Sequence, residues 1–375
     1  MVLMVEQGSA FVAGVILVGA TLVSALRTVI IPRGINDWLT RLMFILVFSV
    51  YQVPMKYGRT YERRDSILAS YAPISLLSLP VLWLTLTLLG YTLMFWAVGV
   101  GSVWEAFHIS GSSLFTLGFA TVDGFVPTAL VFTEAAMGLG LLALVISYLP
   151  TIYAAFSRRE AAVTMLTTRA GNPPSAVEMI IRFHLFHGLE RLVPTWATWE
   201  ALFAEMEESH TSLGVLSFFR SHEPHLSWVT ATGAVLDGAA LILSAVDTPN
   251  QPNAHLCIRA GYLCLRAIAR YLGIPYDPDP RPDDPISISR EEFDDALLQM
   301  QAAGVPLKAD RDQAWRDYAG WRVNYDFVLR AIAGLVYAPY APWSSDRALP
   351  PRRLRFKHTP DYGDVPPKNR AGEIA

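Results

Sequence analysis

Long apolar stretches alternate with short basic segments in the first half of the chain, and amphipathic sequence follows. Residues 9–31, 76–99 and 127–156 are apolar, and each is at least as long as the roughly 20 residues that cross a bilayer. We predict a transmembrane helix for each. Residues 42–55 are apolar too, but this run is shorter and has basic residues on both sides. An interfacial helix at the inner leaflet fits this run better than a span, although a span stays open.

Basic residues predict the orientation of these segments. Arg27 and Arg41 follow the start of the chain, and Arg158 and Arg159 follow the last apolar run. Because basic residues favour the cytoplasmic side, we place the N-terminus outside and the polar half of the chain in the cytoplasm. Residues 1–66 would then form an N-terminal transmembrane helix and an interfacial helix. We expect a multi-pass protein of the cell (plasma) membrane, with the lipid bilayer as a partner.

The second half of the chain repeats apolar residues at spacings of three and four, which is typical of amphipathic helices. Strand alternation is missing. Ser289 stands three residues before Glu292, the spacing of a capping box at a helix start. We predict an all-α cytoplasmic domain of six or seven helices over 158–342. Residues 343–375 are rich in proline and are expected to form an extended or disordered tail.

Composition agrees with a membrane protein and argues against several functions. Hydrophobic residues make up 52% of the chain and charged residues only 17%, against about 25% in soluble domains. A net charge of −3 gives no reason to expect a nucleic-acid partner. Cys257 and Cys264 share one helix face at a spacing too long for a disulfide, so we expect buried thiols. Because no phosphate-binding loop, dinucleotide fingerprint or nucleophile elbow occurs, neither an enzyme nor a cofactor is expected.

Two histidine pairs are candidate metal ligands, His184 with His187 and His222 with His225. Neither pair has the third and fourth ligands that a zinc site needs. We predict solvated or capping histidines and no metal site, and the role of both pairs stays open.

The segment SGSSLFTLGFATVDGFVP, residues 110–127, lies between two predicted spans and is too short and too polar to cross a bilayer. Irregular backbone at membrane depth occurs only where protein buries it or where it lines water. A short helix over 104–115 and a glycine-containing turn therefore predict a re-entrant pore loop over 104–123. The alternative is a plain external loop. In a pore loop, carbonyls of 116–120 would replace an ion's hydration shell, and the negative end of the helix would face the ion.

This stretch resembles the pore region of the potassium-channel family, whose pattern is a pore helix, Thr-Val-Gly-Tyr-Gly-Asp, a proline and an inner helix. The resemblance covers about 75–157. It implies an all-α membrane protein with a potassium-channel-like pore module (outer helix, pore helix, filter, inner helix) over 67–157, plus an extra N-terminal transmembrane helix. The matching positions of the implied ion-conducting filter are Thr116, Leu117, Gly118, Phe119 and Ala120. Ala120 replaces a glycine, so a positive φ there would cost on the order of 1 kcal/mol.

The pattern Thr-x-Gly-Phe at 116–119, with its single glycine, also resembles the pore loops of Trk/Ktr-type potassium transporters. Those proteins carry four pore loops in one chain, whereas this chain has one. Four copies would therefore have to assemble, which predicts a homotetramer.

Further residues are assigned to support and gating. The expected supports of the filter are Ser112, Ser113, Asp123 and Glu134. A charge in lipid costs roughly 2.5–3.5 kcal/mol, so Glu134 must face protein or water. It either supports the filter from behind or is paired within the helix bundle. Gly138 and Gly140 fall near the gating hinge of the family's inner helix.

Two functions stay open. The first is a homotetrameric cation channel in which monovalent cations, with potassium expected, permeate passively and the helical domain assembles the tetramer and biases the gate. The alternative is a non-conducting membrane-anchored sensor or adaptor whose helical domain binds a partner. The gating stimulus is not legible in the sequence.

Overall fold

The computed structural model describes residues 2–30, 37–58, 60–186 and 188–350. These residues are helical almost throughout, and no β-strand occurs among them; one isolated bridge pairs Val246 with Leu307. The prediction of an all-α chain is confirmed.

The chain divides into two compact units. The first, here called the membrane unit, comprises Met1–Ala161 and Val215–Pro224. The second, the helical unit, comprises Ala162–Gly214 and His225–Ala375. The boundary near residue 161 lies close to the predicted one at 158. Residues 215–224 were expected in the helical domain, but they pack with the membrane unit.

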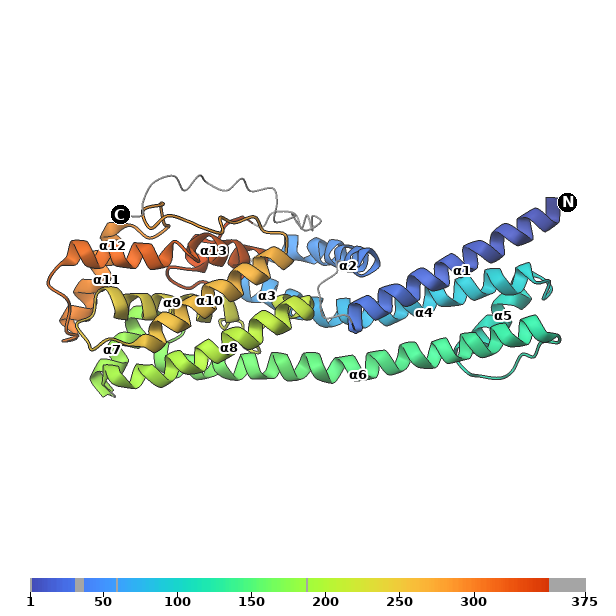
Figure 1. Cartoon of the computed structure of the whole chain (residues 1–375), viewed down its shortest axis with the longest axis horizontal. Coiled ribbons are helices and arrows are strands. Elements are labelled where there is room, and N and C mark those ends of the chain that lie inside the picture. Colours follow the sequence, from blue (N-terminus) through green and yellow to red (C-terminus); the bar gives the residue numbers. More distant parts are fainter. Residues whose placement is uncertain (1, 31–36, 59, 187, 351–375) are drawn as a thin grey trace, which may run out of the picture. The chain divides into compact units, whose positions relative to one another are not determined.

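The membrane unit holds the long apolar helices (Figure 1). Its helices are α1 (Val2–Val29), α2 (Trp38–Tyr57), α3 (Tyr61–Ala69), α4 (Tyr71–Ala97), α5 (Val103–Leu114) and the first part of α6 (Phe125–Ala170). In the described residues, four segments are long and apolar enough to cross a membrane: α1, α2, α3 with α4, and α6. The chain is therefore a membrane protein.

The helices α1 and α4 pack along each other, because small and polar residues let them touch. A Cβ atom added at Gly14 would lie 2.5 Å from the Gly90 carbonyl oxygen, so the two backbones meet there. Farther along, Trp83 Nε1 donates to Ser24 Oγ at 3.2 Å. Ser24 Oγ in turn donates to Asp37 Oδ2 at 2.5 Å, and Asp37 caps α2. This buried polar chain ties α1, α2 and α4 together.

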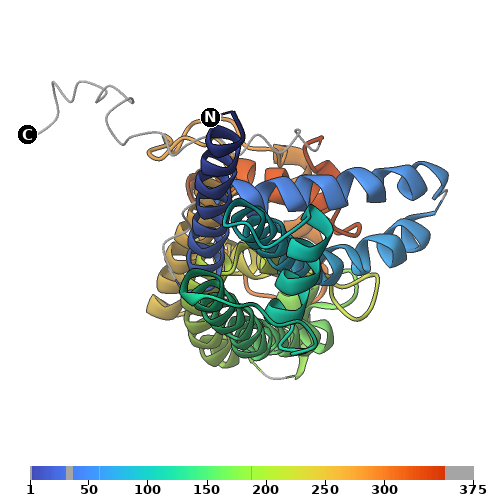
Figure 2. The ribbon, with the colours of Figure 1, turned by 90° about the vertical axis from the view of Figure 1, so that its right-hand side faces the viewer.

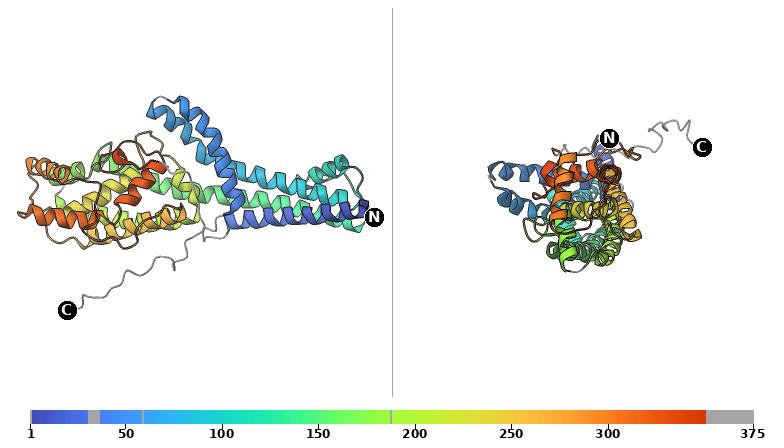
Figure 3. Two further views of the ribbon diagram at one scale, coloured as in Figure 1. Left: turned by 90° about the horizontal axis from the view of Figure 1, so that it is seen from above. Right: turned by 90° about the vertical axis from the view of Figure 1, so that its left-hand side faces the viewer.

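The helix α2 turns away from the direction of α1 and α4. With α3 it forms a hairpin that projects to the side of the other membrane helices, at the opposite end of α1 from the N-terminus (Figures 2 and 3). By length and composition α2 qualifies as a span, and it is longer than the predicted run 42–55. Its sideways course favours the interfacial alternative, because a spanning helix would run alongside α1 and α4.

The helical unit surrounds one central helix, α9. Its described residues contain seven α-helices, which agrees with the prediction: α7 (Ala176–Phe186), α8 (Val193–Ser212), α9 (Trp228–Ser244), α10 (Pro252–Tyr271), α11 (Arg290–Ala302), α12 (Arg311–Arg322) and α13 (Asp326–Leu335). Almost every residue of α9 is buried, and α7, α10, α12 and α13 contact it. The predicted capping box of Ser289 and Glu292 begins α11. Cys257 and Cys264 are buried free thiols, as expected.

A buried ion-pair network fixes α9 against α12 and α13. Arg322 Nη1 donates to both carboxylate oxygens of Asp237 at 2.6 Å, and Arg322 Nε donates to Asp326 Oδ1 at 2.8 Å. Tyr325 Oη donates to Asp237 Oδ1 at 2.8 Å, and Tyr318 Oη does so at 3.3 Å. Burial alone would raise the pKa of Asp326, but the adjacent Arg322 guanidinium outweighs it and holds that pKa below its usual range.

The first residues of the predicted tail are ordered by contacts within this unit. A short 3-10 helix, η3 (Ser345–Arg347), places Arg347 so that its Nη2 donates to Glu292 Oε1 at 2.6 Å. Leu349 N donates to the carbonyl oxygen of Arg330 at 3.1 Å. Residues 343–350 are therefore part of the folded unit, and residues 351–375 lie outside the described residues.

Candidate functional site

The helix α5 begins at one end of the membrane unit, and the chain that follows it returns to the same end. It has 12 residues, hence a length of about 18 Å, too short to cross a bilayer core of about 30 Å. A capping box of Ser102 and Glu105 begins it. The chain runs inward along α5, and residues 115–124 return to the same end, where α6 begins (Figure 1). The predicted helix 104–115 is found one residue earlier, and the course is re-entrant.

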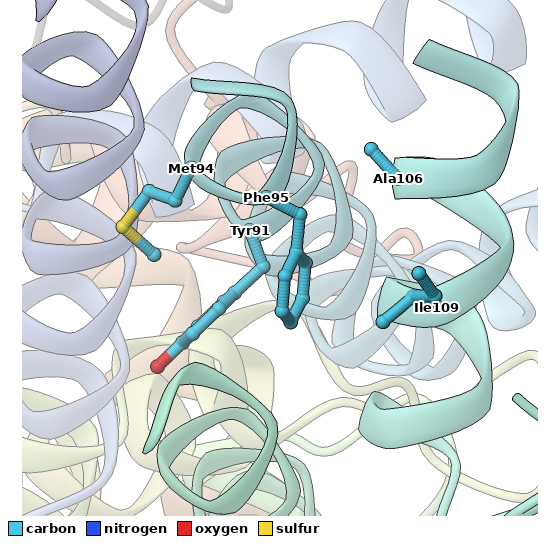
Figure 4. Packing of buried hydrophobic residues seen from close by; sticks show 5 residues of the cluster. All are labelled: Tyr91, Met94, Phe95, Ala106 and Ile109. Atoms are coloured by element: carbon cyan, nitrogen blue, oxygen red, sulfur yellow. The ribbon is translucent and has the colours of Figure 1, made fainter. Parts of the chain in front are cut away.

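An apolar cluster holds α5 against α4. Tyr91, Met94 and Phe95 of α4 and Ala106 and Ile109 of α5 form its buried part, and the Phe95 ring points toward Ile109 (Figure 4). Residues of α6 and of the returning loop pack on this cluster as well. The inward end of α5 is therefore fixed on two sides by helices.

The backbone N–H groups after α5 turn back to one serine. Leu117 N and Gly118 N donate to the Ser112 carbonyl oxygen at 2.8 and 3.4 Å. Phe119 N and Ala120 N donate to Ser112 Oγ, both at 3.1 Å. Ser112 is 2% exposed. One buried residue thus receives the donors of four consecutive residues.

The carbonyl groups of the same segment are left without partners. Within the described part of the chain, no carbonyl oxygen of 116–120 accepts a hydrogen bond. Thr116 has a φ of 54° and Gly118 one of 70°. A β-branched residue at positive φ is rare, and such strain of about 1–3 kcal/mol tends to occur at functional sites. The left-handed residues of this segment are Thr116 and Gly118, so Ala120 does not bear the cost that a positive φ would bring there.

Glu134 belongs to α6 and contacts α5. It is fully buried, and its Oε1 accepts from Ser110 Oγ at 2.5 Å. Its Oε2 has no hydrogen-bond partner in the described residues. Three residues along α5, Ser113 Oγ donates to the Val131 carbonyl oxygen at 2.8 Å. Two serines three residues apart on α5 therefore meet two positions three residues apart on α6.

Ser110 is the contact that the sequence analysis missed. Glu134 lies close to the expected support Ser113, and its Oε1 also accepts a hydrogen bond from Ser110, which was not predicted. The matching spacing of Ser110 with Ser113 and of Val131 with Glu134 was a usable signal, since residues three apart share a helix face.

Gly138 and Gly140 have different surroundings. A Cβ atom added at Gly138 would lie 2.3 Å from the Leu114 carbonyl oxygen, so α6 needs a glycine here to approach the end of α5. Nothing lies within 4 Å of a Cβ at Gly140. Of the two predicted hinge glycines, Gly138 thus lies against the end of α5, whereas Gly140 has no neighbouring atom at the position of a side chain.

The predicted support Asp123 lies away from these contacts. Asp123 is exposed, and the structure does not bring it to Ser112 or Glu134. His108 packs its ring on Phe119, with centroids 4.7 Å apart.

Among the described residues no group of three or more His, Cys, Asp or Glu could hold a metal ion. His187 lies outside the described residues, so its pair with His184 stays a prediction.

No protein-family model, curated protein or solved structure matches this chain. The chemistry of the site therefore rests on its own geometry. That geometry offers carbonyl oxygens without partners in the described residues, at the C-terminal, negative end of the half-buried helix α5.

Proposed function

We propose that four copies of this chain form a cation channel and that residues 116–120 of each copy line the shared pathway. One observation carries the proposal: the N–H groups of 117–120 bond to Ser112, whereas the carbonyls of 116–120 have no partner within the described residues. Residues 116–119 are exposed in the single chain and Ala120 is partly exposed, so their carbonyl oxygens are open to water or to a ligand. A permeating cation is such a ligand.

Potassium is the permeant ion that this chemistry favours. Carbonyl oxygens replace water around a weakly hydrated cation, and the negative end of the α5 dipole adds to the attraction. The positive φ of Thr116 and of Gly118, two residues apart, supports the proposal of an unusual backbone path in this segment. No cofactor takes part in this passive conduction. One segment per chain requires a homotetramer for a closed ring.

The remaining predicted residues take distinct roles in this proposal. Ser112 holds the segment on α5. Ser113 binds α6 at Val131, and Glu134 of α6 binds α5 at Ser110, so both brace α5 against α6. We place any bend of α6 at Gly140, because Gly138 is occupied in contact with Leu114. In the cell membrane, the N-terminus and the segment 116–120 would face outside and the helical unit the cytoplasm.

The test compares potassium and sodium flux in proteoliposomes for the parent and two glycine variants. Gly118 and Gly99 both have positive φ, 70° and 82°, and a Cβ at either meets no atom within 4 Å. Gly118→Ala and Gly99→Ala therefore carry the same kind of backbone strain. We expect parent flux to favour potassium, Gly118→Ala to lose it and Gly99→Ala to keep it.

Three results would oppose the proposal. A verified tetramer without flux would reject conduction, and equal potassium and sodium flux would reject selectivity. Cross-linking that yields only monomers or dimers would favour the non-conducting sensor or adaptor, since fewer than four segments cannot close the pathway.

A further inference from the structure

Residues Val215–Pro224, here called the strap, belong to the membrane unit although the chain on both sides of them belongs to the helical unit. The strap follows α8 and precedes α9 in the sequence. It begins within a short 3-10 helix, Gly214–Phe218. Any displacement of the ends of α8 or α9 must therefore act on the strap through the chain itself.

One side of the strap is fixed to the far end of α6. Arg159 is 1% exposed, and its Nη1 and Nη2 donate to the carbonyl oxygens of Leu216 and Phe219, both at 2.8 Å. Glu160 Oε1 accepts from Arg159 Nε at 3.0 Å. The ring of Phe156 packs on that of Phe219, with centroids 5.5 Å apart. Because a guanidinium is charged at all physiological pH values, this buried contact needs all of these acceptors.

The other side of the strap is fixed to the base of the outer helix. Arg220 forms a salt bridge with Asp65 of α3, and its Nη2 donates to Tyr61 Oη at 3.0 Å. The side chains of Arg220 and Asp65 are only 11% and 9% exposed. Phe218 packs edge-on against Tyr71, the first residue of α4, with ring centroids 6.0 Å apart.

We propose that the strap braces α6 against the start of α4 and that the helical unit controls the channel gate through it. This inference rests on the proposed function, since it assigns the regulation of that pathway. Alternate residues of the strap contact α6 and the α3–α4 segment, so moving these two apart must break one set of buried contacts. A conformational equilibrium shifts only where two states differ in contacts, and the strap supplies such a difference.

Arg159 and Arg220 are positioning residues in this scheme, because they act on the gate and not on the permeating ion. Removing their contacts is expected to change how often the gate is open. It is not expected to change the current through an open channel or the ratio of potassium to sodium permeability.

The first experiment exchanges the charges of the strap salt bridge and records single channels. We expect Arg220→Asp and Asp65→Arg each to change open probability by about fivefold or more, a typical allosteric coupling. The double variant should return toward the parent value, with unitary conductance and selectivity unchanged throughout. Arg158→Gln, which removes the exposed arginine next to Arg159, is the matched control and should behave as the parent.

Two outcomes of the recordings would overturn the inference. One is an unchanged open probability in assembled tetramers of both single variants. The other is a parallel loss of conductance and selectivity, which would show general damage to the pathway.

The second experiment does not depend on conduction or on the charge exchange. Hydrogen–deuterium exchange of the full-length protein is compared for the parent, Arg159→Met and Arg158→Gln. The brace predicts faster exchange in Arg159→Met both in the strap and in α6 around residues 150–161, with residues 103–120 unchanged. Faster exchange of the strap alone would overturn the brace. A parent protein that conducts nothing would reject the channel, and the exchange result would then decide the bracing of α6 by itself.

Discussion

Polar groups pair with one another in one unit of this protein, whereas a row of carbonyl oxygens has no partner in the described residues of the other. In the helical unit, the buried charges of Asp237, Arg322 and Asp326 satisfy one another, and two tyrosines complete the network. In the membrane unit, the carbonyls of 116–120 accept nothing within the described residues, although their own N–H groups are paired.

Paired polar groups stabilise a fold, whereas polar groups without partners can bind a ligand. A network whose members all pair leaves no group for a ligand, and its purpose is to fix helices. A row of acceptors without donors is tolerated where water or an ion meets it. The two regions should therefore respond differently to substitution: the first in stability, the second in selectivity.

The largest effect is expected from opening the closed network. Arg322→Met leaves the buried carboxylates of Asp237 and Asp326 without their shared counter-charge. Breaking a buried pair in this way costs about 3–5 kcal/mol of unfolding free energy. Urea unfolding of the detergent-solubilised full chain, followed by tryptophan fluorescence, measures the loss.

A matched control for this prediction lies on the same helix. Arg316 is exposed, and its guanidinium donates to Gln313 Oε1 of the same helix. We expect Arg316→Met to change stability by no more than about 0.5 kcal/mol. A similar small change for Arg322→Met would mean that the network does not hold the helical unit together.

The second effect should appear where the backbone donors of the membrane unit converge. Ser112→Ala removes the hydroxyl oxygen that accepts from Phe119 N and Ala120 N. Each buried donor left unpaired costs about 1–3 kcal/mol, so the segment should relax. We expect weaker discrimination between potassium and sodium in proteoliposome flux. Ser112→Thr keeps the oxygen and should keep selectivity; equal losses in both variants would show that the hydroxyl is not the relevant group.

The third prediction sharpens the contrast between two glycines of α6. Gly138→Ala brings a methyl group against the Leu114 carbonyl, so α5 and α6 must separate at a cost of about 1–3 kcal/mol. Gly140→Ala meets no atom and should stabilise the helix by about 0.5–1 kcal/mol. Thermal unfolding midpoints of the two variants should therefore move in opposite directions. Midpoints that move together would contradict the close approach of these helices.

Most of the helices could be predicted from the sequence because their signals involve only neighbouring residues. Ser289 with Glu292 marked the start of α11, because a capping box involves only neighbouring residues. The helix before the segment 116–120 was placed within one residue, since an apolar run and a glycine turn bound it. Apolar length likewise identified the membrane helices.

The features that could not be predicted from the sequence depend on tertiary contacts. Arg158 and Arg159 are adjacent and chemically alike, yet only packing against the strap buries the second. The positive φ of Thr116 was not predicted, because the path of the backbone there depends on hydrogen bonds to Ser112. The contact of Glu134 with Ser110 joins residues on two helices, and no local rule reports it directly.

The smallest effect concerns a half-exposed ion pair at the edge of the helical unit, where the closed network gives way to solvent. Hydrogen bonds from Arg347 hold the pKa of Glu292 below its ordinary value of 4.5. Because the folded-state pKa is lowered, the pair stabilises the fold above pH 4.5, and this stabilisation is lost as the pH falls through the folded-state pKa. Exposure limits the effect, since the Glu292 side chain is 39% exposed and water screens the pair. In Glu292→Gln, unfolding midpoints should fall less between pH 5 and pH 3 than in the parent, whereas Asp295→Asn, at an exposed site on the same helix, should leave the parent slope unchanged. An equal slope in Glu292→Gln and the parent would show that the carboxylate gains nothing from Arg347 in the folded state.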